Sequence, residues 1–224
     1  MIEEKTFKEI MRGRKGSFAI WPPRDDNDFK KVDVPEELTE YEKIKDRLKP
    51  HIIFVAMNMA KKDDKPFANF HSTEKSHNDY RLRDAINSVF DDGSSTPFFE
   101  GAYMTDFFNF PCPRAKCVKC HFHNQKALEA AVAAFVEECN NVCQGEKYII
   151  SIGTGFHYEI IKKYLKNEQN FNCLFSECFS RKPCFYIPHH SGAAGKTDMQ
   201  YTNEAKDQLT LIMEEIKRRH TEQE

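Results

Sequence analysis

The sequence lacks a charge excess of either sign. Its 33 Lys and Arg residues are offset by 35 Asp and Glu residues, which leaves a formal net charge of -2 over 224 residues. No global basic field therefore attracts nucleic acid. A nucleic-acid partner would need a local basic face, because attraction to phosphate depends on where the Lys and Arg residues lie.

Long apolar segments are missing too. No apolar run approaches the roughly 20 residues that cross a bilayer, and the first ten residues, MIEEKTFKEI, lack the apolar core of a signal peptide. We therefore expect an intracellular protein, cytoplasmic or nuclear, with no membrane partner. The eight cysteines are then expected as free thiols or metal ligands, because disulfides are rare in a reducing compartment.

The sequence also has no internal repeat and no low-complexity linker, and its length suits one domain. Residues 1–50 are charged and interrupted by WPPRDD. They predict a helical extension, with one helix at the N-terminus and another near 37–48, packed on the domain. Residues 51–224 are expected to form the α/β domain itself.

Short apolar runs alternate with helical periodicity after residue 50. We expect strands at 51–57, 101–105, 147–153 and 184–189, and helices at 79–90, at 125–143, over YEIIKKYLKN and from about Asn203. In the second helix, one face carries Leu128, Val132, Phe135, Cys139 and Val142. This order predicts an α/β fold: a single three-layer domain with a four-stranded, mainly parallel sheet flanked by helices.

Polar residues follow three of these strands. Asn58, Asp106 and His189 come directly after the first, second and fourth strands, and KPFANFH, with Phe67 and Phe70, follows Asn58 after a charged stretch. Ligands of parallel sheets bind beyond the carboxyl ends of the strands, so these residues are candidates for one site. The alternatives are capping roles for Asn58 and Asp106 and core positions for the two phenylalanines.

The stretch IPHHSGAAGKTD suggests two other sites that its spacing argues against. GAAGKT is similar to a phosphate-binding loop, but the first glycine of that loop would fall on His190. The adjacent His189 and His190 are poor partners for one metal ion, because neighbouring residues of an extended strand point to opposite sides.

Three cysteines form the remaining candidate site. Cys112, Cys117 and Cys120 have C-x4-C-x2-C spacing, part of the plant-type iron–sulfur pattern, and two histidines follow closely. Such clusters also suit zinc. Free thiols are the other interpretation, and we expect no cofactor, with zinc or an iron–sulfur cluster as the alternative.

Four motifs in order resemble the uracil-DNA glycosylase superfamily, and its poorly characterised branch in particular. VAMNMA with KPFANFH is similar to the first motif of that superfamily, GAYMTD to its second strand, SIGTGFHYEII to its third strand with a glycine, and IPHHSG to its His-Pro-Ser motif. The order and spacing agree from about residue 50 to residue 200. The resemblance implies a glycosylase-like domain over 51–224.

The resemblance implies an enzyme of DNA repair that hydrolyses the N-glycosidic bond of a flipped-out base in DNA or in a nucleoside-type ligand. Asn58 would position the attacking water, and His189 would stabilise the leaving base by a hydrogen bond. The implied base-binding residues are Phe67, which would stack on the base, with Phe70, Asp106 and Ser191. The implied DNA contacts are Lys62, Lys65 and Lys196, within a wider basic group that includes Arg81 and Arg83.

Three positions depart from the family pattern. Ala56 replaces a glycine, Met59 replaces a proline, and Asp106 stands where an asparagine is common. An ionised carboxylate only accepts hydrogen bonds, so Asp106 implies a base with an exocyclic amine, a protonated carboxyl group or lost activity. The loop after His189 also lacks a bulky wedge, which leaves single strands, mismatches and free nucleosides open. The alternatives are a non-catalytic nucleic-acid or nucleotide-binding module and a zinc- or iron-bearing regulatory protein.

Overall fold

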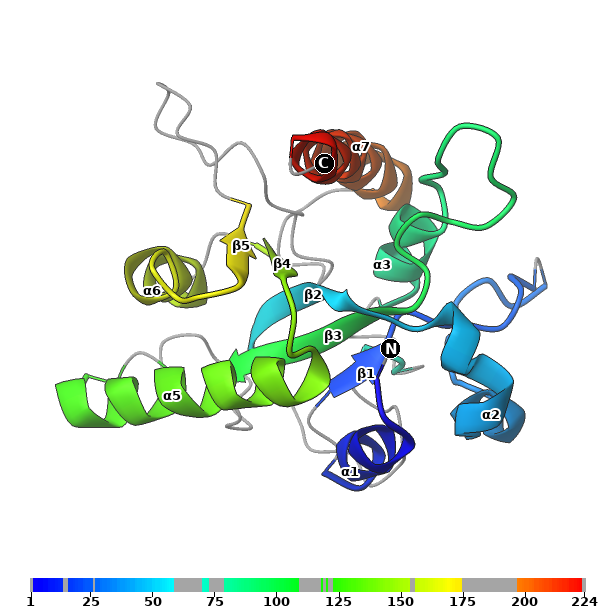
Figure 1. Cartoon of the computed structure of the whole chain (residues 1–224). Coiled ribbons are helices and arrows are strands. Elements are labelled where there is room, and N and C mark those ends of the chain that lie inside the picture. The colour runs from blue at the N-terminus through cyan, green and yellow to red at the C-terminus, as the bar shows by residue number, and fades with distance from the viewer. Residues whose placement is uncertain are drawn as a thin grey trace.

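A five-stranded mixed sheet runs through the centre of the protein (Figure 1). The computed structural model describes residues 2–13, 16–25, 27–58, 70–72, 79–108, 118, 120, 123–153, 156–174 and 197–222. In spatial order the strands are β1 (Gly16–Phe18), β3 (Ala102–Phe108), β2 (Lys49–Asn58), β4 (Lys147–Ser151) and β5 (Phe171–Cys173). β1 is antiparallel to β3, and every other neighbouring pair is parallel.

The α/β class and the mainly parallel pairing are confirmed, but the expected number of four strands is wrong, because the described residues form a sheet of five. Both edge strands, β1 and β5, went unpredicted because a strand of three residues is too short to show alternation. The strand expected at 184–189 lies outside the described residues.

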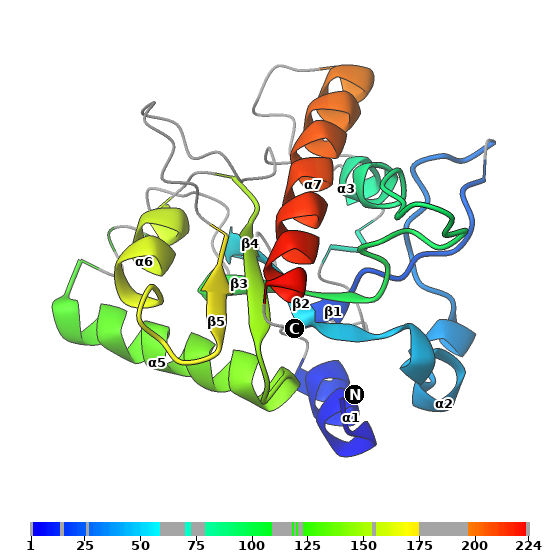
Figure 2. The same cartoon turned by 45° about the horizontal axis from the view of Figure 1, so that its top comes forward.

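Helices cover both faces of the sheet (Figure 2). On one face lie α3 (Asp79–Ile86) and α7 (Asp198–Thr221). On the other lie α1 (Glu4–Gly13), α5 (Gln125–Val142) and α6 (Phe156–Tyr164). Between β1 and β2 the chain forms the short helices η1 (Glu36–Thr39), α2 (Tyr41–Ile44) and η2 (Lys45–Arg47). No helix of the described ranges is both long enough and apolar enough to cross a membrane.

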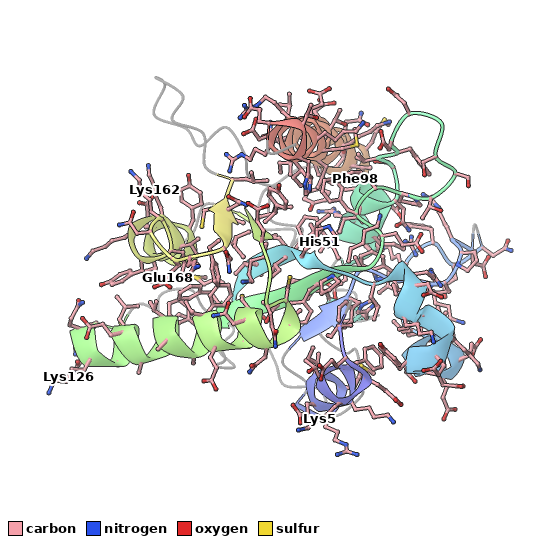
Figure 3. The ribbon with its side chains drawn as sticks, viewed as in Figure 1. Lys5, His51, Phe98, Lys126, Lys162 and Glu168 are labelled. Carbon is pink, nitrogen blue, oxygen red and sulfur yellow. The ribbon has the colours of Figure 1, made fainter. Side chains whose placement is uncertain are left out.

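The three central strands divide their side chains between two hydrophobic cores (Figure 3). Phe54 of β2 lies in register with Met104 and Ile150, and all three belong to the core under α3 and α7. The next row, centred on Ile53, belongs to the core under α1, α5 and α6. This alternation is the reason that β2 is apolar on both sides.

The periodicity of α5 is confirmed. The helix begins at Gln125, where the Asn124 side chain caps it by accepting a hydrogen bond from the backbone N–H of Lys126 at 2.9 Å. Four of the five residues expected on its apolar face are buried in the core: Val132, Phe135, Cys139 and Val142. The fifth, Leu128, is partly buried beside them.

β1 packs closely on β3 at Gly16. A Cβ atom at this position would lie 2.1 Å from the hydroxyl oxygen of Tyr103, so only glycine allows the approach. The segment before residue 50 supplies an edge strand of the sheet and the predicted N-terminal helix α1, whereas the single helix predicted near 37–48 is replaced by the short helices η1, α2 and η2.

Candidate functional site

The strand order places a topological switch point at β2. From β2 the chain passes through α3 to β3 on one side, and from β3 through α5 to β4 on the other side. In parallel sheets with this arrangement, ligands bind beyond the carboxyl ends of the two strands at the switch. Asn58 is the last residue of β2, and Gly153 lies just beyond the end of β4.

The end of β4 is held by a tight turn. The backbone N–H of Ile152 donates to the carbonyl oxygen of Val55 at 2.8 Å, which continues the ladder, and the Ser151 hydroxyl donates to the carbonyl oxygen of Gly153 at 2.7 Å. Gly153 has a φ of 81°, a conformation that strongly favours glycine. The chain thus turns sharply from β4 toward α6.

Asp106 lies inside a strand and not directly after one. β3 continues to Phe108, so the expected end at residue 105 is wrong. Asp106 is buried and pairs in register with Ala56, while Phe108 pairs with Asn58. Asp106 on β3 therefore lies level with Ala56 of β2, two residues before the level of Asn58.

The KPFANFH motif ends in a buried, fixed conformation. Phe70 belongs to the hydrophobic core and has a φ of 64°, which is unusual for a bulky residue and costs roughly 1–3 kcal/mol. Next to it, the ring of His71 lies with Nε2 3.1 Å from the carbonyl oxygen of Phe18 and Nδ1 3.3 Å from that of Val32. The motif is thereby tied to the N-terminal segment.

The environment of His71 favours a neutral ring. Burial lowers its pKa from 6.5 to about 4, although Asp79 and the two carbonyl groups act in the opposite direction. The indole ring of Trp21 lies 5.2 Å from the imidazole ring, measured between centroids. The Asp79 carboxylate also accepts a hydrogen bond from the backbone N–H of Ser72 at 2.8 Å.

A second polar contact joins α3 to α7, which lie side by side (Figure 2). Oδ1 of Asp198 accepts hydrogen bonds from the Tyr80 hydroxyl at 2.9 Å and from Nε of Arg81 at 2.6 Å. We call these three residues the Asp198 network. The network lies in the first turns of the two helices. In the sequence, α3 comes directly after residues 59–78 and α7 comes after 175–196, which carry the main sequence motifs.

The end of IPHHSGAAGKTD forms a helix cap. The Thr197 hydroxyl accepts from the backbone N–H of Gln200 at 3.3 Å, and the Gln200 side chain accepts from the backbone N–H of Thr197 at 3.0 Å. α7 therefore begins at Asp198 and not near Asn203, as the apolar periodicity alone predicted. The Thr that made this stretch similar to a phosphate loop is a capping residue.

Several predicted site residues lie outside the described residues: Phe67, His189, Ser191, Lys62, Lys65, Lys196, Cys112 and Cys117. For Asn58 the structure describes the backbone only. Cys120 is an exposed free thiol, and the described ranges contain no group of three His, Cys, Asp or Glu side chains placed to hold a metal ion.

Arg83 does not reach the surface as a phosphate-binding residue would. It is buried, and its guanidinium donates to the carbonyl oxygens of Lys31 at 2.7 Å and Phe29 at 2.5 Å.

Sequence reasoning also missed Trp21, the only tryptophan. Its Nε1 is buried with no hydrogen-bond partner in the part of the chain that the structure describes. Its proximity to His71 was hidden because WPPRDD predicts only a loop.

Comparison of the chain with protein-family models, curated proteins and solved structures finds no match. The register places the backbone of Asn58 and the buried Asp106 on neighbouring strands near the switch point, while His71 and the Asp198 network hold α3 to the N-terminal segment and to α7.

The buried, neutral His71 predicts acid-sensitive stability. The unfolded chain binds a proton on this residue near pH 6.5 and the folded chain only near pH 4, so its contribution is complete above pH 6.5 and is lost as the pH falls toward 4. Each tenfold difference in proton affinity is worth about 1.4 kcal/mol, so the loss is roughly 3 kcal/mol. Urea unfolding of His71→Asn between pH 4 and 7 should show a flatter profile than the unmodified protein. The exposed His123, changed to Asn, should leave the profile unaltered.

The Asp198 network predicts energetic coupling between α3 and α7. In a double-mutant cycle of Arg81→Gln and Asp198→Asn, urea unfolding should give a coupling energy of about 1 kcal/mol, because the Arg81 side chain is only 11% exposed while that of Asp198 is 46% exposed. The pair Lys43–Glu40, with both side chains more than half exposed, is the control and should couple by less than about 0.5 kcal/mol. Equal coupling energies for the two pairs would contradict a structural role for the network.

Proposed function

We propose that the protein is a glycosylase-like hydrolase that cleaves the N-glycosidic bond of a base in DNA. One observation carries the proposal: the asparagine of the first glycosylase-like motif ends β2 at the topological switch point of the sheet. This is where a parallel sheet binds its ligand. The four motifs that resemble the superfamily supply the reaction class.

The chemistry suits the residue types. Cleavage breaks the bond between the anomeric carbon and the base nitrogen, so positive charge develops on the sugar and negative charge on the base. Asn58 would hold a water molecule against the sugar carbon through its side-chain oxygen, and water would supply the new oxygen of the sugar. His189 would donate a hydrogen bond to the base and stabilise its negative charge.

Asp106 would select the base. It is buried in β3, in register with Ala56, where an ionised carboxylate accepts hydrogen bonds but donates none. A base with an exocyclic amine, as in cytosine, offers a hydrogen-bond donor to such a group. Uracil offers an acceptor at the same position and would be disfavoured.

The surrounding contacts favour a site of fixed geometry. His71 ties the end of the first motif segment to the backbone of the N-terminal segment, and the Asp198 network joins α3 to the start of α7. A catalytic asparagine and histidine on separate segments need such anchoring, because small displacements of reacting groups slow a reaction markedly.

A binding module that kept the fold is the second candidate. The buried carboxylate of Asp106 favours it, because an ionised group there would repel the anion that forms when the base leaves. The replacements Ala56 and Met59 in the first motif favour it as well. The two candidates differ in one observable, the release of a base.

The first test measures abasic sites in labelled single- and double-stranded oligonucleotides that contain uracil, hypoxanthine, cytosine or mismatches. We expect release of a base from at least one of them, and a loss of about 100-fold or more for His189→Ala and Asn58→Ala. The adjacent His190→Ala is the matched control and should keep most of the activity. Tight binding of oligonucleotides with no base released would establish the binding module instead, and full activity of His189→Ala would refute the mechanism.

The second test concerns the base. Asp106→Asn supplies both a donor and an acceptor, so the ratio of uracil release to cytosine release should rise by about tenfold or more, as expected for a gain of roughly 1.4 kcal/mol in favour of uracil. Competition between the two oligonucleotides in one reaction measures the ratio directly. An unchanged ratio would remove Asp106 from base recognition while leaving the reaction class intact.

A further inference from the structure

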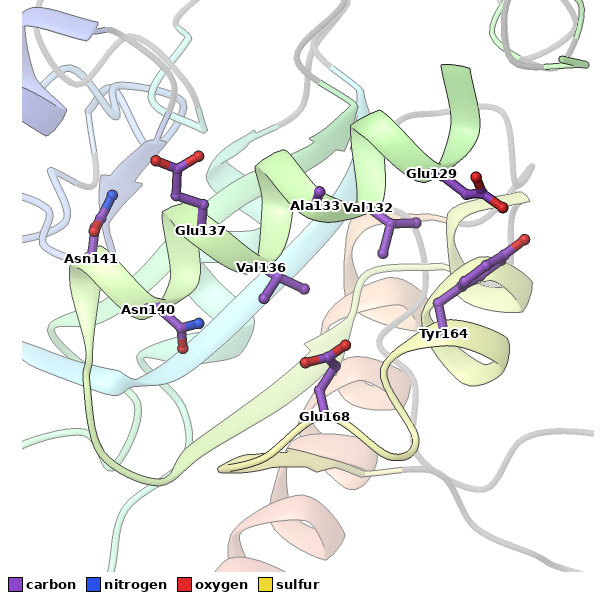
Figure 4. A pocket seen from close by; sticks show the side chains of 9 residues that line it. All are labelled: Glu129, Val132, Ala133, Val136, Glu137, Asn140, Asn141, Tyr164 and Glu168. Carbon is purple, nitrogen blue, oxygen red and sulfur yellow. The ribbon is translucent and has the colours of Figure 1, made fainter. Parts of the chain in front are cut away.

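A groove lies between α5 and α6, in the helix layer on the opposite side of the sheet from α3 and α7 (Figure 4). Its volume is about 520 Å³. The apolar part is formed by Val132, Ala133 and Val136 of α5 and by the ring of Tyr164 at the end of α6. In Figure 4 the side chains of Val132 and Val136 point toward Tyr164 and Glu168 across the groove.

One wall of the groove is held in place by a side-chain amide. Nε2 of Gln125 donates to Oε1 of Glu129 at 2.8 Å and to the Tyr164 hydroxyl oxygen at 2.9 Å. The amide therefore fixes an anionic group beside an aromatic ring, and it joins the start of α5 to the end of α6. A ligand at this wall meets groups that are already oriented.

The rim of the groove is acidic. Glu129, Glu137 and Glu168 line it, and none of the described Lys or Arg residues does. None of the ion pairs formed within the described ranges includes these three carboxylates. Elsewhere, comparable helix carboxylates are paired, as Glu215 is with Arg218 and Arg219.

Four described lysines of the surrounding elements make other contacts or point elsewhere, and the exposed Lys166 of the turn after α6 forms no ion pair with the rim in the described ranges. Lys126 and Lys162 point away from the space between the two helices, whereas Glu168 lies between them (Figure 3). Lys163 lies against the Tyr164 ring, 4.9 Å from its centroid, without lining the groove. Lys147 is buried and donates to Oδ1 of Asn140 at 2.9 Å. Within the described residues, the groove thus combines an apolar floor with carboxylates that form no ion pair.

We propose that the α5–α6 groove binds a linear aliphatic polyamine. Charge complementarity carries the choice: the ligand must present separated ammonium groups to the rim and a methylene chain to Val132, Val136 and Tyr164. Glu129 and Glu137 are eight residues apart on α5, which corresponds to roughly 12 Å along the helix axis. That separation suits the extended length of a triamine such as spermidine.

Other cationic ligands fit the groove less well. The volume of the groove, about 520 Å³, is in the range of small-molecule sites. A stable protein partner would need a much larger contact surface, with about 1,200 Å² or more buried in total. A divalent metal ion would use the carboxylates but not the apolar floor. The proposal is independent of the glycosidase reaction, since the groove and the switch point lie in different parts of the molecule.

Isothermal titration calorimetry of the full chain with spermidine, at constant ionic strength, tests the proposal. We expect saturable binding of one equivalent, and weaker binding by about threefold to fivefold for Glu168→Gln and for Glu129→Gln, as for partly exposed charge pairs. The matched control is Glu159→Gln, an exposed carboxylate of α6 outside the groove, which should leave the affinity within about twofold. Putrescine, with a shorter chain and two charges, should bind more weakly.

Val136→Thr tests the apolar floor, because it keeps the shape and introduces a hydroxyl. It should weaken the binding of spermidine, measured at a temperature at which the far-ultraviolet circular dichroism shows that the variant is folded, because Val136 also packs against the core. Equal effects of Glu159→Gln and Glu168→Gln, or equal displacement by magnesium chloride, would overturn the proposal and indicate diffuse charge attraction only. Tighter binding of a Lys-rich peptide than of spermidine would also overturn it, in favour of a protein partner.

Discussion

The ladder that β2 forms with β3 and β4 is the constraint on which the other features depend. β2 is covered on both faces and paired on both edges, so its register with its neighbours is fixed by two hydrophobic cores at once. That register determines where Asp106 lies relative to Ala56 and where the chain leaves β4 at Gly153. A shift of one residue would move every apolar side chain of β2 to the wrong core.

The contacts that anchor the motif segments differ in kind from this ladder. They are polar, few and made between segments far apart in the chain: Arg81 and Asp198 are separated by 117 positions, and His71 meets the carbonyl of Phe18 across 53. Buried groups of this type depend on their partners, because an unpaired donor or acceptor in the interior is costly. The N-terminal segment is therefore part of the structural support of the α3–α7 side.

The sequence predicted the regular parts of this fold because their signals are local. The apolar face of α5 and the apolar run of β2 are visible in the order of residues, and both are buried as expected. The start of α7 was predicted too late because its first turn is set by the Thr197 cap and not by apolar periodicity. The ends of β3, the edge strands and the Asp198 network depend on contacts between distant segments, which one sequence does not reveal. Of the candidate site, the sequence predicted that Asn58 ends its strand region, but it placed Asp106 after its strand and did not reveal that Trp21 and His71 are in contact.

Among the residues that the structure describes, the sheet ends on each side in a strand of only three residues, β1 and β5. An edge strand exposes unpaired backbone N–H and C=O groups, which can template the addition of a strand from another molecule, and the length of the exposed edge limits how much can be gained. The long, strongly apolar strands occupy the centre of this sheet, and the short ones occupy its borders. Within the described residues, the order of the strands thus leaves little backbone at the borders for another molecule to pair with, while it keeps the apolar centre fully paired.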